Sequence, residues 1–130
     1  MQFLFLLYGD ESAKMTPEQG AQARERQWAI IDESTRKGVL RGCSPLQPST
    51  ATVSTRAQSG SVVAIDGPFA ETKEALGGFY LIDCRDAEEA KYWGGRLAQT
   101  GCATGVEIRP LAQIPGRVEA EDDVASAVHA

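Results

Sequence analysis

The sequence predicts a single α+β domain with an antiparallel sheet and two helices on one face of it. Three observations support this prediction. A chain of 130 residues has the size of one domain and can hold its own core. Apolar or alternating runs typical of strands are interrupted twice by segments with helical spacing. Helix starts, glycines and prolines divide these segments in the order β-α-β, hairpin, β-α-β.

The first strand and the first helix have clear local signals. Phe3 to Tyr8 reads FLFLLY and is apolar at nearly every position, as expected for a strand covered on both faces. The residues TPEQ at 16–19 combine an N-cap threonine, a proline at the first helical position and a capping-box glutamine. Gly38 fits the C-terminal cap. We therefore expect a helix over about 17–37.

The buried face of this helix is predicted from residues that recur near helical spacing. They are Ala21, Trp28, Ile31 and Thr35. Both tryptophans of the chain, Trp28 and Trp93, are expected on the helix faces that pack against the sheet. The sequence thus predicts that both indole rings belong to the core.

The middle of the chain predicts a short strand and a hairpin. Val39 to Cys43 is expected to be a weak strand. The prolines in Ser44 to Pro48 are incompatible with a regular sheet interior, so this segment is expected to be an extended loop. Thr50 to Thr55 alternates, and AQSG at 57–60 turns the chain into Ser61 to Ile65. We expect these two runs to pair as a hairpin.

The second half predicts a strand, a helix and a final strand. Phe79 to Cys84 alternates as a strand does, and Asp86 is placed to cap the helix that follows. Glycine costs up to about 1 kcal/mol relative to alanine inside a helix, so the pair at 94–95 indicates a close approach to the sheet. VEIR at 106–109 is the last strand. The apolar helix face is expected to contain Ala90, Trp93, Gly94 and Leu97.

This order of elements is the ferredoxin-like plan, with a hairpin added in its middle. Two helices cannot cover both faces of the sheet, and a second copy of the chain is the simplest cover for the open face. We therefore predict a homodimer with its sheets packed face to face. The domain is expected over residues 1–113, followed by a tail over 114–130. From about Val118 the tail is polar and alanine-rich and is expected to be mobile or to form an extra helix.

Composition restricts the kinds of partner. The net charge of −5 disfavours binding to nucleic-acid phosphates and to anionic membranes, so neither is expected as a partner. The longest apolar run is far shorter than the roughly 20 residues that span a bilayer. A signal peptide begins with a basic region, whereas residue 2 is Gln, and we expect a cytoplasmic protein.

Cysteine and histidine usage disfavours several kinds of chemistry. The three cysteines are widely spaced and form no CxxC pair, so reduced thiols are expected. The single histidine is His129, next to the C-terminal residue. Histidine metal sites and Ser-His or Cys-His pairs are therefore not expected. No metal and no cofactor is predicted.

The segment DGPFAETKEALGGF at 66–79 concentrates the polar residues most suited to a site. Asp66 follows an apolar strand, where partial desolvation would raise its pKa toward that of a general base. The alternative is an Asx-turn, in which the Asp66 side chain accepts backbone N–H groups and fixes the turn completed by Gly67 and Pro68. The long connection itself is expected to leave the sheet, cross the mouth of a cavity and return.

Other candidate residues surround this segment. Lys73 is a candidate catalytic group that would hold an anionic substrate or stabilise an enolate-like intermediate. Arg41 could bind a carboxylate ligand or pair with Asp66 or Glu71. Glu71, Thr72 and Glu74 are candidate ligand-binding residues, with solvated loop ion pairs as the alternative. Tyr8 offers a phenol for a ligand or, alternatively, packs in the core with its hydroxyl satisfied.

The chain resembles the DGPF proteins of the YCII-related family, over about residues 1–111. The resemblance rests on several segments in the expected order, which are FLFLLYGDE at 3–11, LQP at 46–48, TATV at 50–53, DGPFAETKE at 66–74, GGFYLID at 77–83 and VEIRPL at 106–111. It implies a ferredoxin-like α+β fold and a dimeric α+β barrel. It also implies an architecture similar to muconolactone isomerases and other small barrels that hold hydrophobic or aromatic ligands.

The chain departs from part of this family pattern. A His–Asp pair is suggested as catalytic in shorter YCII-type relatives, whereas the only histidine here is His129. DGPF-type relatives are also often encoded beside sigma factors of the extracytoplasmic-function class, which implies a regulatory context.

Three functions fit these observations. The first is a cofactor-free acid–base enzyme, such as an isomerase or lyase, acting on a small organic acid with Asp66 as base and Lys73 or Arg41 holding the anion. The second is a non-catalytic ligand-binding or accessory protein linked to transcriptional control. The third is a dimeric module whose long loop binds a partner chain through an exposed apolar patch.

Overall fold

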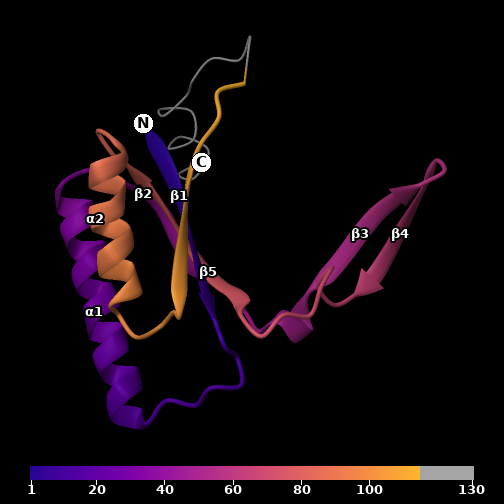
Figure 1. Cartoon of the computed structure of the whole chain (residues 1–130), viewed down its shortest axis with the longest axis horizontal. Helices are drawn as coiled ribbons and strands as arrows, with labels where there is room; N and C mark the ends of the chain where they lie inside the picture. The colour runs from indigo at the N-terminus through magenta and orange to yellow at the C-terminus, as the bar shows by residue number, and fades with distance from the viewer. Residues whose placement is uncertain (115–130) are drawn as a thin grey trace.

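The computed structural model describes residues 1–114 and has two parts, a two-layer body and a projecting hairpin (Figure 1). The body contains two helices and a four-stranded sheet, and the hairpin is a separate two-stranded sheet. The elements in chain order are β1 (Gln2–Gly9), α1 (Pro17–Arg36), β2 (Leu40–Pro45), the 3₁₀ helix η1 (Ser49–Ala51), β3 (Val53–Gln58), β4 (Ser61–Asp66), β5 (Ala75–Asp83), α2 (Ala87–Ala98) and β6 (Gly105–Pro110).

The body sheet has the strand order β2-β5-β1-β6, and each neighbouring pair is antiparallel. Without the hairpin the connectivity is β-α-β-β-α-β, and both helices cover the same face (Figure 1). The predicted α+β class, with two helices, an antiparallel sheet and a hairpin, is confirmed. The predicted tail from Val118 lies outside the described residues. Within residues 1–114, no helix is long and apolar enough to cross a membrane.

Alternation along β1 separates the two faces of the sheet. Phe3, Phe5 and Leu7 are buried against the helices, while the residues between them are only partly buried and lie on the opposite face. We call that opposite face, which neither α1 nor α2 covers, the open face. Within residues 1–114 of one chain only the helix side of β1 is covered, and the predicted cover of its other face by a second copy stays a prediction. The core between sheet and helices contains Phe3, Phe5, Leu7, Ile30, Tyr80, Ile82, Cys84, Ala90, Trp93 and Leu97.

Helix α1 starts as predicted but turns a different stripe toward the core. Thr16 and Gln19 form both hydrogen bonds of the capping box. The buried residues, however, are Ala23, Ile30 and Ser34. Ser34 is buried because its hydroxyl donates to the Ile30 carbonyl oxygen at 2.7 Å, which satisfies the polar group.

The two tryptophans have opposite environments. Trp93 on α2 is 1 % exposed and is the largest side chain of the core. Trp28 on α1 is 62 % exposed, so the prediction that it is buried is wrong. The buried stripe passes one helical position away from Trp28, and an error of one position rotates a residue by about 100° around the helix.

The two glycines of α2 differ in their surroundings. A Cβ atom on Gly94 would collide with the side chain of Ile108 on β6, whereas a Cβ on Gly95 would meet no atom within 4 Å. The predicted close approach of helix and sheet is thus confirmed at Gly94 and is wrong at Gly95. The tight contact between α2 and β6 therefore lies at Gly94 and not at Gly95.

The hairpin β3–β4, which we call the arm (residues 53–66), pairs from Val53 opposite Asp66 to Gln58 opposite Ser61. Its two-residue turn has positive φ angles at Ser59 (48°) and Gly60 (83°), the geometry that favours tight hairpins. The predicted hairpin is confirmed. The arm extends away from the body rather than along an edge of its sheet (Figure 1).

Candidate functional site

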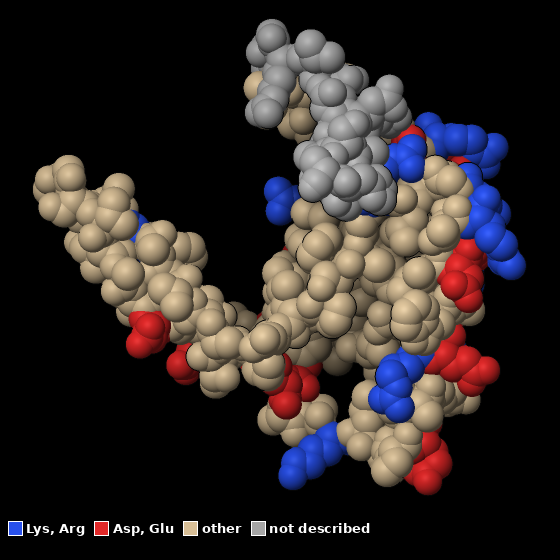
Figure 2. Space-filling view, turned by 180° about the vertical axis from the view of Figure 1, so that it is seen from behind, with Lys and Arg blue, Asp and Glu red and all other residues tan. Residues whose placement is uncertain are grey.

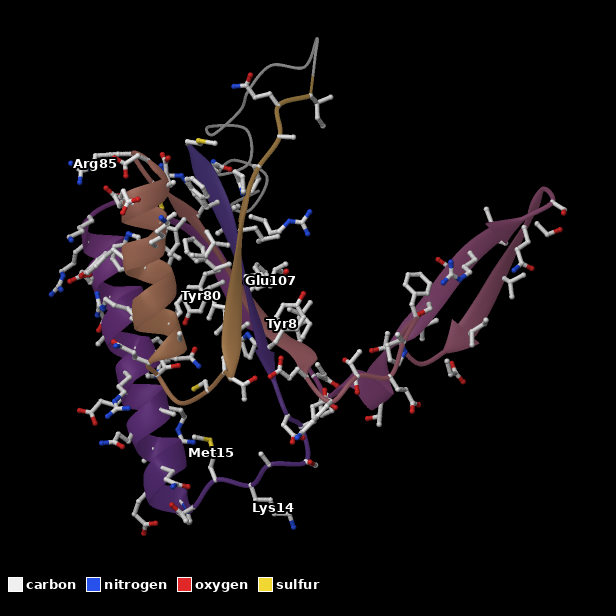
Figure 3. All side chains as sticks on the ribbon, viewed as in Figure 1. Tyr8, Lys14, Met15, Tyr80, Arg85 and Glu107 are labelled. Atoms are coloured by element: carbon white, nitrogen blue, oxygen red, sulfur yellow. The ribbon has the colours of Figure 1, made fainter. Side chains whose placement is uncertain are left out.

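The open face of the sheet carries a polar cluster formed by Tyr8, Glu107 and Arg109. The three residues come from neighbouring strands, since β1 and β6 pair with Leu6 opposite Glu107 and Leu4 opposite Arg109. Tyr8 and Glu107 lie together on the side of the sheet away from the helices (Figure 3). We call these three residues the Tyr8 cluster.

Hydrogen bonding to the neighbouring Glu107 carboxylate raises the pKa of the Tyr8 phenol above its ordinary value of 10.0. Burial of the phenol and the negative charge of Glu107 raise this pKa further, while the positive charge of Arg109 lowers it. At neutral pH Tyr8 is therefore a protonated donor, with a carboxylate and a guanidinium beside it.

The strands beside the Tyr8 cluster supply apolar side chains. Leu4 lies opposite Leu81, and Leu6 lies opposite Phe79, across the central pair β1 and β5. All four are partly buried on the open face. An apolar surface with a few convergent polar groups at its side is the usual composition of a small-molecule site.

Sequence reasoning identified Tyr8 but missed Glu107 and Arg109. Alternation in VEIR at 106–109 already places both charged residues on one face of a strand. Their position beside Tyr8 depends on the register between β1 and β6, which pairs residues about 100 positions apart. The sequence therefore shows that Glu107 and Arg109 share a face, but it does not show that this face lies beside Tyr8.

Arg41, the second predicted residue on the body sheet, has a structural partner. Its guanidinium donates to the Gly38 carbonyl oxygen at 2.7 Å and forms an ion pair with Asp83 at 3.3 Å. Asp83 also binds the N-terminal ammonium of Met1 at 2.9 Å. The carboxylate that Arg41 meets is thus Asp83, and neither Asp66 nor Glu71 as the sequence suggested.

Asp66, Glu71 and Thr72 lie at the base of the arm. Asp66 is the last residue of β4 and is exposed. Glu71 and Thr72 line a hollow of about 750 Å³ between the segments before and after the arm. The Thr72 hydroxyl donates to the Glu74 carbonyl oxygen at 2.6 Å. The connection after Asp66 thus borders a hollow, in keeping with its predicted path, while the roles of these side chains stay predictions.

Lys73 and Glu74 lie near the ends of β1 and β6. The hydroxyl and backbone N–H of Ser12 lower the pKa of Asp10, and the positive charge of Lys73 lowers it further. The Glu74 carboxylate accepts a hydrogen bond from the Thr104 hydroxyl at 3.0 Å. Lys73 therefore faces an acidic side chain of its own chain, and Glu74 ties the start of β5 to the loop before β6.

A second hollow of about 220 Å³ lies on the helix side of the sheet. The Tyr80 hydroxyl donates to Gln27 Oε1 there at 2.9 Å, and burial raises the pKa of Tyr80. Cys43 and Cys102 also line it, and burial raises the pKa of Cys43. Cys43, Cys84 and Cys102 are free thiols. Within residues 1–114, no three His, Cys, Asp or Glu side chains gather in a way that could hold a metal ion.

Comparison with known proteins agrees with the resemblance drawn from the motifs. The model of the YCII-related domain matches residues 1–112. An uncharacterized protein of Rhizobium meliloti (strain 1021), R00369, is 37 % identical over 115 residues, which cover 86 % of this chain and 93 % of that protein. The family match includes the body and the arm. The chain therefore belongs to the YCII-related family.

Proposed function

We propose that the protein is a homodimer that binds a small organic acid against the open face of the sheet, with the Tyr8 cluster as its polar group. The observation that carries this proposal is the placement of Tyr8 beside Glu107 and Arg109, next to Leu4, Leu6, Phe79 and Leu81 on the same face. Sheets packed face to face would enclose this surface and exclude water from it, which strengthens each polar contact.

Each residue of the Tyr8 cluster has a chemical role in this proposal. Arg109 would bind the ligand carboxylate through its planar pair of donors. Glu107 would take a proton from the carbon next to the carboxylate, and Tyr8, protonated, would donate a hydrogen bond to the oxygen that gains negative charge. When the acid carries a carbon–carbon double bond beyond that carbon, return of the same proton to the far carbon, with a shift of the double bond, completes an isomerisation. Such a reaction conserves atoms and electrons and uses no cofactor.

Asp66 and Lys73 give an alternative arrangement for the same chemistry. They would act as base and anion-binding residue at the base of the arm, where Glu71 and Thr72 line the larger hollow. The Tyr8 cluster is preferred because its three side chains already contact or face one another on an apolar surface. The two arrangements predict losses at different residues.

The test is a titration of the intact protein with benzoate and phenylacetate, followed by two-dimensional NMR. We expect shifts at β1 and β6, and a loss of affinity of at least about tenfold in Arg109→Gln because a charge-assisted pair is removed. Arg24→Gln is the matched control, since Arg24 is exposed on α1, which covers the opposite face. Losses in Asp66→Asn and Lys73→Gln, with Arg109→Gln unchanged, would favour the alternative arrangement.

A second candidate function is supported by the exposed apolar side chains near the long connection. Phe69 is 66 % exposed and Ile65 56 % exposed, as a chain-binding module requires. This function is a non-catalytic accessory protein for an extracytoplasmic-function sigma factor. It would replace the first if benzoate and phenylacetate leave the spectrum unchanged while a purified sigma factor of this class binds and shifts the arm residues.

A further inference from the structure

The arm is an apolar surface that no other part of residues 1–114 covers. Of its fourteen positions, 53–66, all but Ser54 are exposed, and Val62 is 74 % exposed. One side carries Val53, Ala57, Val62 and Ala64 by the strand register, and Val63 and Ile65 lie on the other. Figure 2 shows that Lys, Arg, Asp and Glu gather on the body, whereas the arm is almost free of charge.

A two-stranded hairpin of this kind is at best marginally stable in water. The arm has one basic residue, Arg56, whose guanidinium lies 4.2 Å from the Phe69 ring centre, and one acidic residue, Asp66. Among residues 1–114, no third strand pairs with β3 or β4, so both strand edges have free N–H and C=O groups. Uncharged, unpaired edges invite association with another chain.

The arm and the open face border the same concavity. The arm leaves the body below the sheet and rises opposite the face that the helices do not cover (Figure 1). The space-filling view shows an open V between the arm and the body (Figure 2). Each wall of this V carries apolar side chains, with Leu4, Leu6, Phe79 and Leu81 on the sheet and the valines on the arm.

The area of these walls suits a dimer only when both are used. Four strands about 4.8 Å apart and roughly 20 Å long give the open face a flat area of about 400 Å². The face of the arm that forms the other wall adds roughly 200 Å² on the same spacing, which brings the two walls to about 600 Å². A stable interface buries about 800 Å² on each partner, so the sheet face alone supplies about half of it.

We propose that the arm crosses to a second copy of the chain, so that each subunit's sheet is clasped in the V of the other. A two-fold axis would place both apolar walls of one subunit against those of its partner. The charges near the walls are of both signs, Glu107 with Arg109 and Asp83 with Arg41, and so suit a surface that meets its own copy. This inference rests on the homodimer of the proposed function, but not on the organic acid.

The test measures dimer dissociation by sedimentation velocity in wild type, Val62→Glu and Trp28→Glu. Both substituted residues are exposed and apolar in the single chain, so the body should fold in each variant. We expect Val62→Glu to raise the dimer dissociation constant by roughly 100-fold, since two arms per dimer each lose a buried contact. Trp28→Glu, on the outer side of α1, should keep the wild-type constant.

Amide hydrogen exchange gives an independent readout. Residues 53–66 should be protected in the wild-type dimer and should lose protection on dilution or in Val62→Glu, while β1 and β5 stay protected. A monomeric wild type would contradict both the homodimer and the exchanged arm. A dimer of unchanged affinity in Val62→Glu, equal weakening in Trp28→Glu, or an arm that exchanges freely in the dimer would contradict the arm alone.

Discussion

The body and the arm are built from similar strand sequences but reach opposite degrees of burial. In β1 every second side chain packs against the helices, and Phe5 is fully buried. In β4 the run SVVAI is also largely apolar, yet each of its residues is exposed. A short apolar run thus predicts that a strand forms, whereas burial depends on which other element covers the strand.

The largest expected effect separates a buried body residue from an exposed arm residue. Phe5→Ala should lower the free energy of unfolding by about 3–5 kcal/mol, because a large cavity is left in the core. Val62→Ala, measured in the dissociated subunit, should change it by less than about 0.5 kcal/mol. Urea unfolding at high dilution measures both. Similar losses for the two variants would mean that the arm is covered by its own chain.

An intermediate effect comes from alkaline pH and concerns the body alone. Burial raises the pKa of the Cys84 thiol from 9.0 to about 11, and the charges of Glu89 and Asp83 add to this. Between these values the unfolded chain has released the proton and the folded chain retains it, so stability falls as pH rises. Two pKa units correspond to about 2.7 kcal/mol, lost from about pH 9 and fully by about pH 11.

Unfolding measured against pH in wild type and Cys84→Ala checks this loss. The variant should retain a smaller decline, because the raised pKa of Tyr8 and the raised pKa of Tyr80 act in the same direction at higher pH. The arm has no cysteine or tyrosine, so it contributes nothing of this kind. An identical slope in the variant would show that the Cys84 thiol is not the titrating group.

The smallest effect compares two adjacent glycines within the body. Gly95→Ala should stabilise the protein by up to about 1 kcal/mol, because alanine favours the helix and the site is open. Gly94→Ala should instead destabilise it by roughly 1–2 kcal/mol, since the new methyl group collides with Ile108. Urea unfolding of the two variants measures the sign and size of each change in stability. If both substitutions changed the free energy of unfolding in the same direction, α2 would be free to shift over β6.

Local chemistry predicted most of the elements of this fold. The capping box at Thr16, the cap at Asp86 and the turn at Ser59–Gly60 each act through neighbours a few residues away, so sequence reasoning found them. The same is true of the α+β order of elements. Interactions between distant segments could not be predicted. They depend on which residues of two strands pair and on how far each helix is rotated about its axis, and local sequence patterns do not specify either.

Two examples show this limit at the candidate site and in the core. Glu107 meets Tyr8 only through the pairing of β1 with β6, and Arg41 meets Asp83 only through that of β2 with β5. The direction of Trp28 depends on a helix rotation that a buried serine, Ser34, helps to define. Because Ser34 is polar, it does not contribute to an apolar pattern. The predicted buried stripe of α1 was therefore placed one residue away from the observed one.

The arm also has a consequence for how relatives of this chain could diverge. Strands β2 and β5 pair directly, with Pro45 opposite Gly78, so the body would be continuous if a short turn joined them. Residues 46–74 form a single long connection between the neighbouring strands β2 and β5. A single insertion, deletion or exchange in the gene could add, remove or replace this connection without disturbing the helices or the core. The choice of partner chain that we propose for the arm could then evolve independently of the helices and the four-stranded sheet.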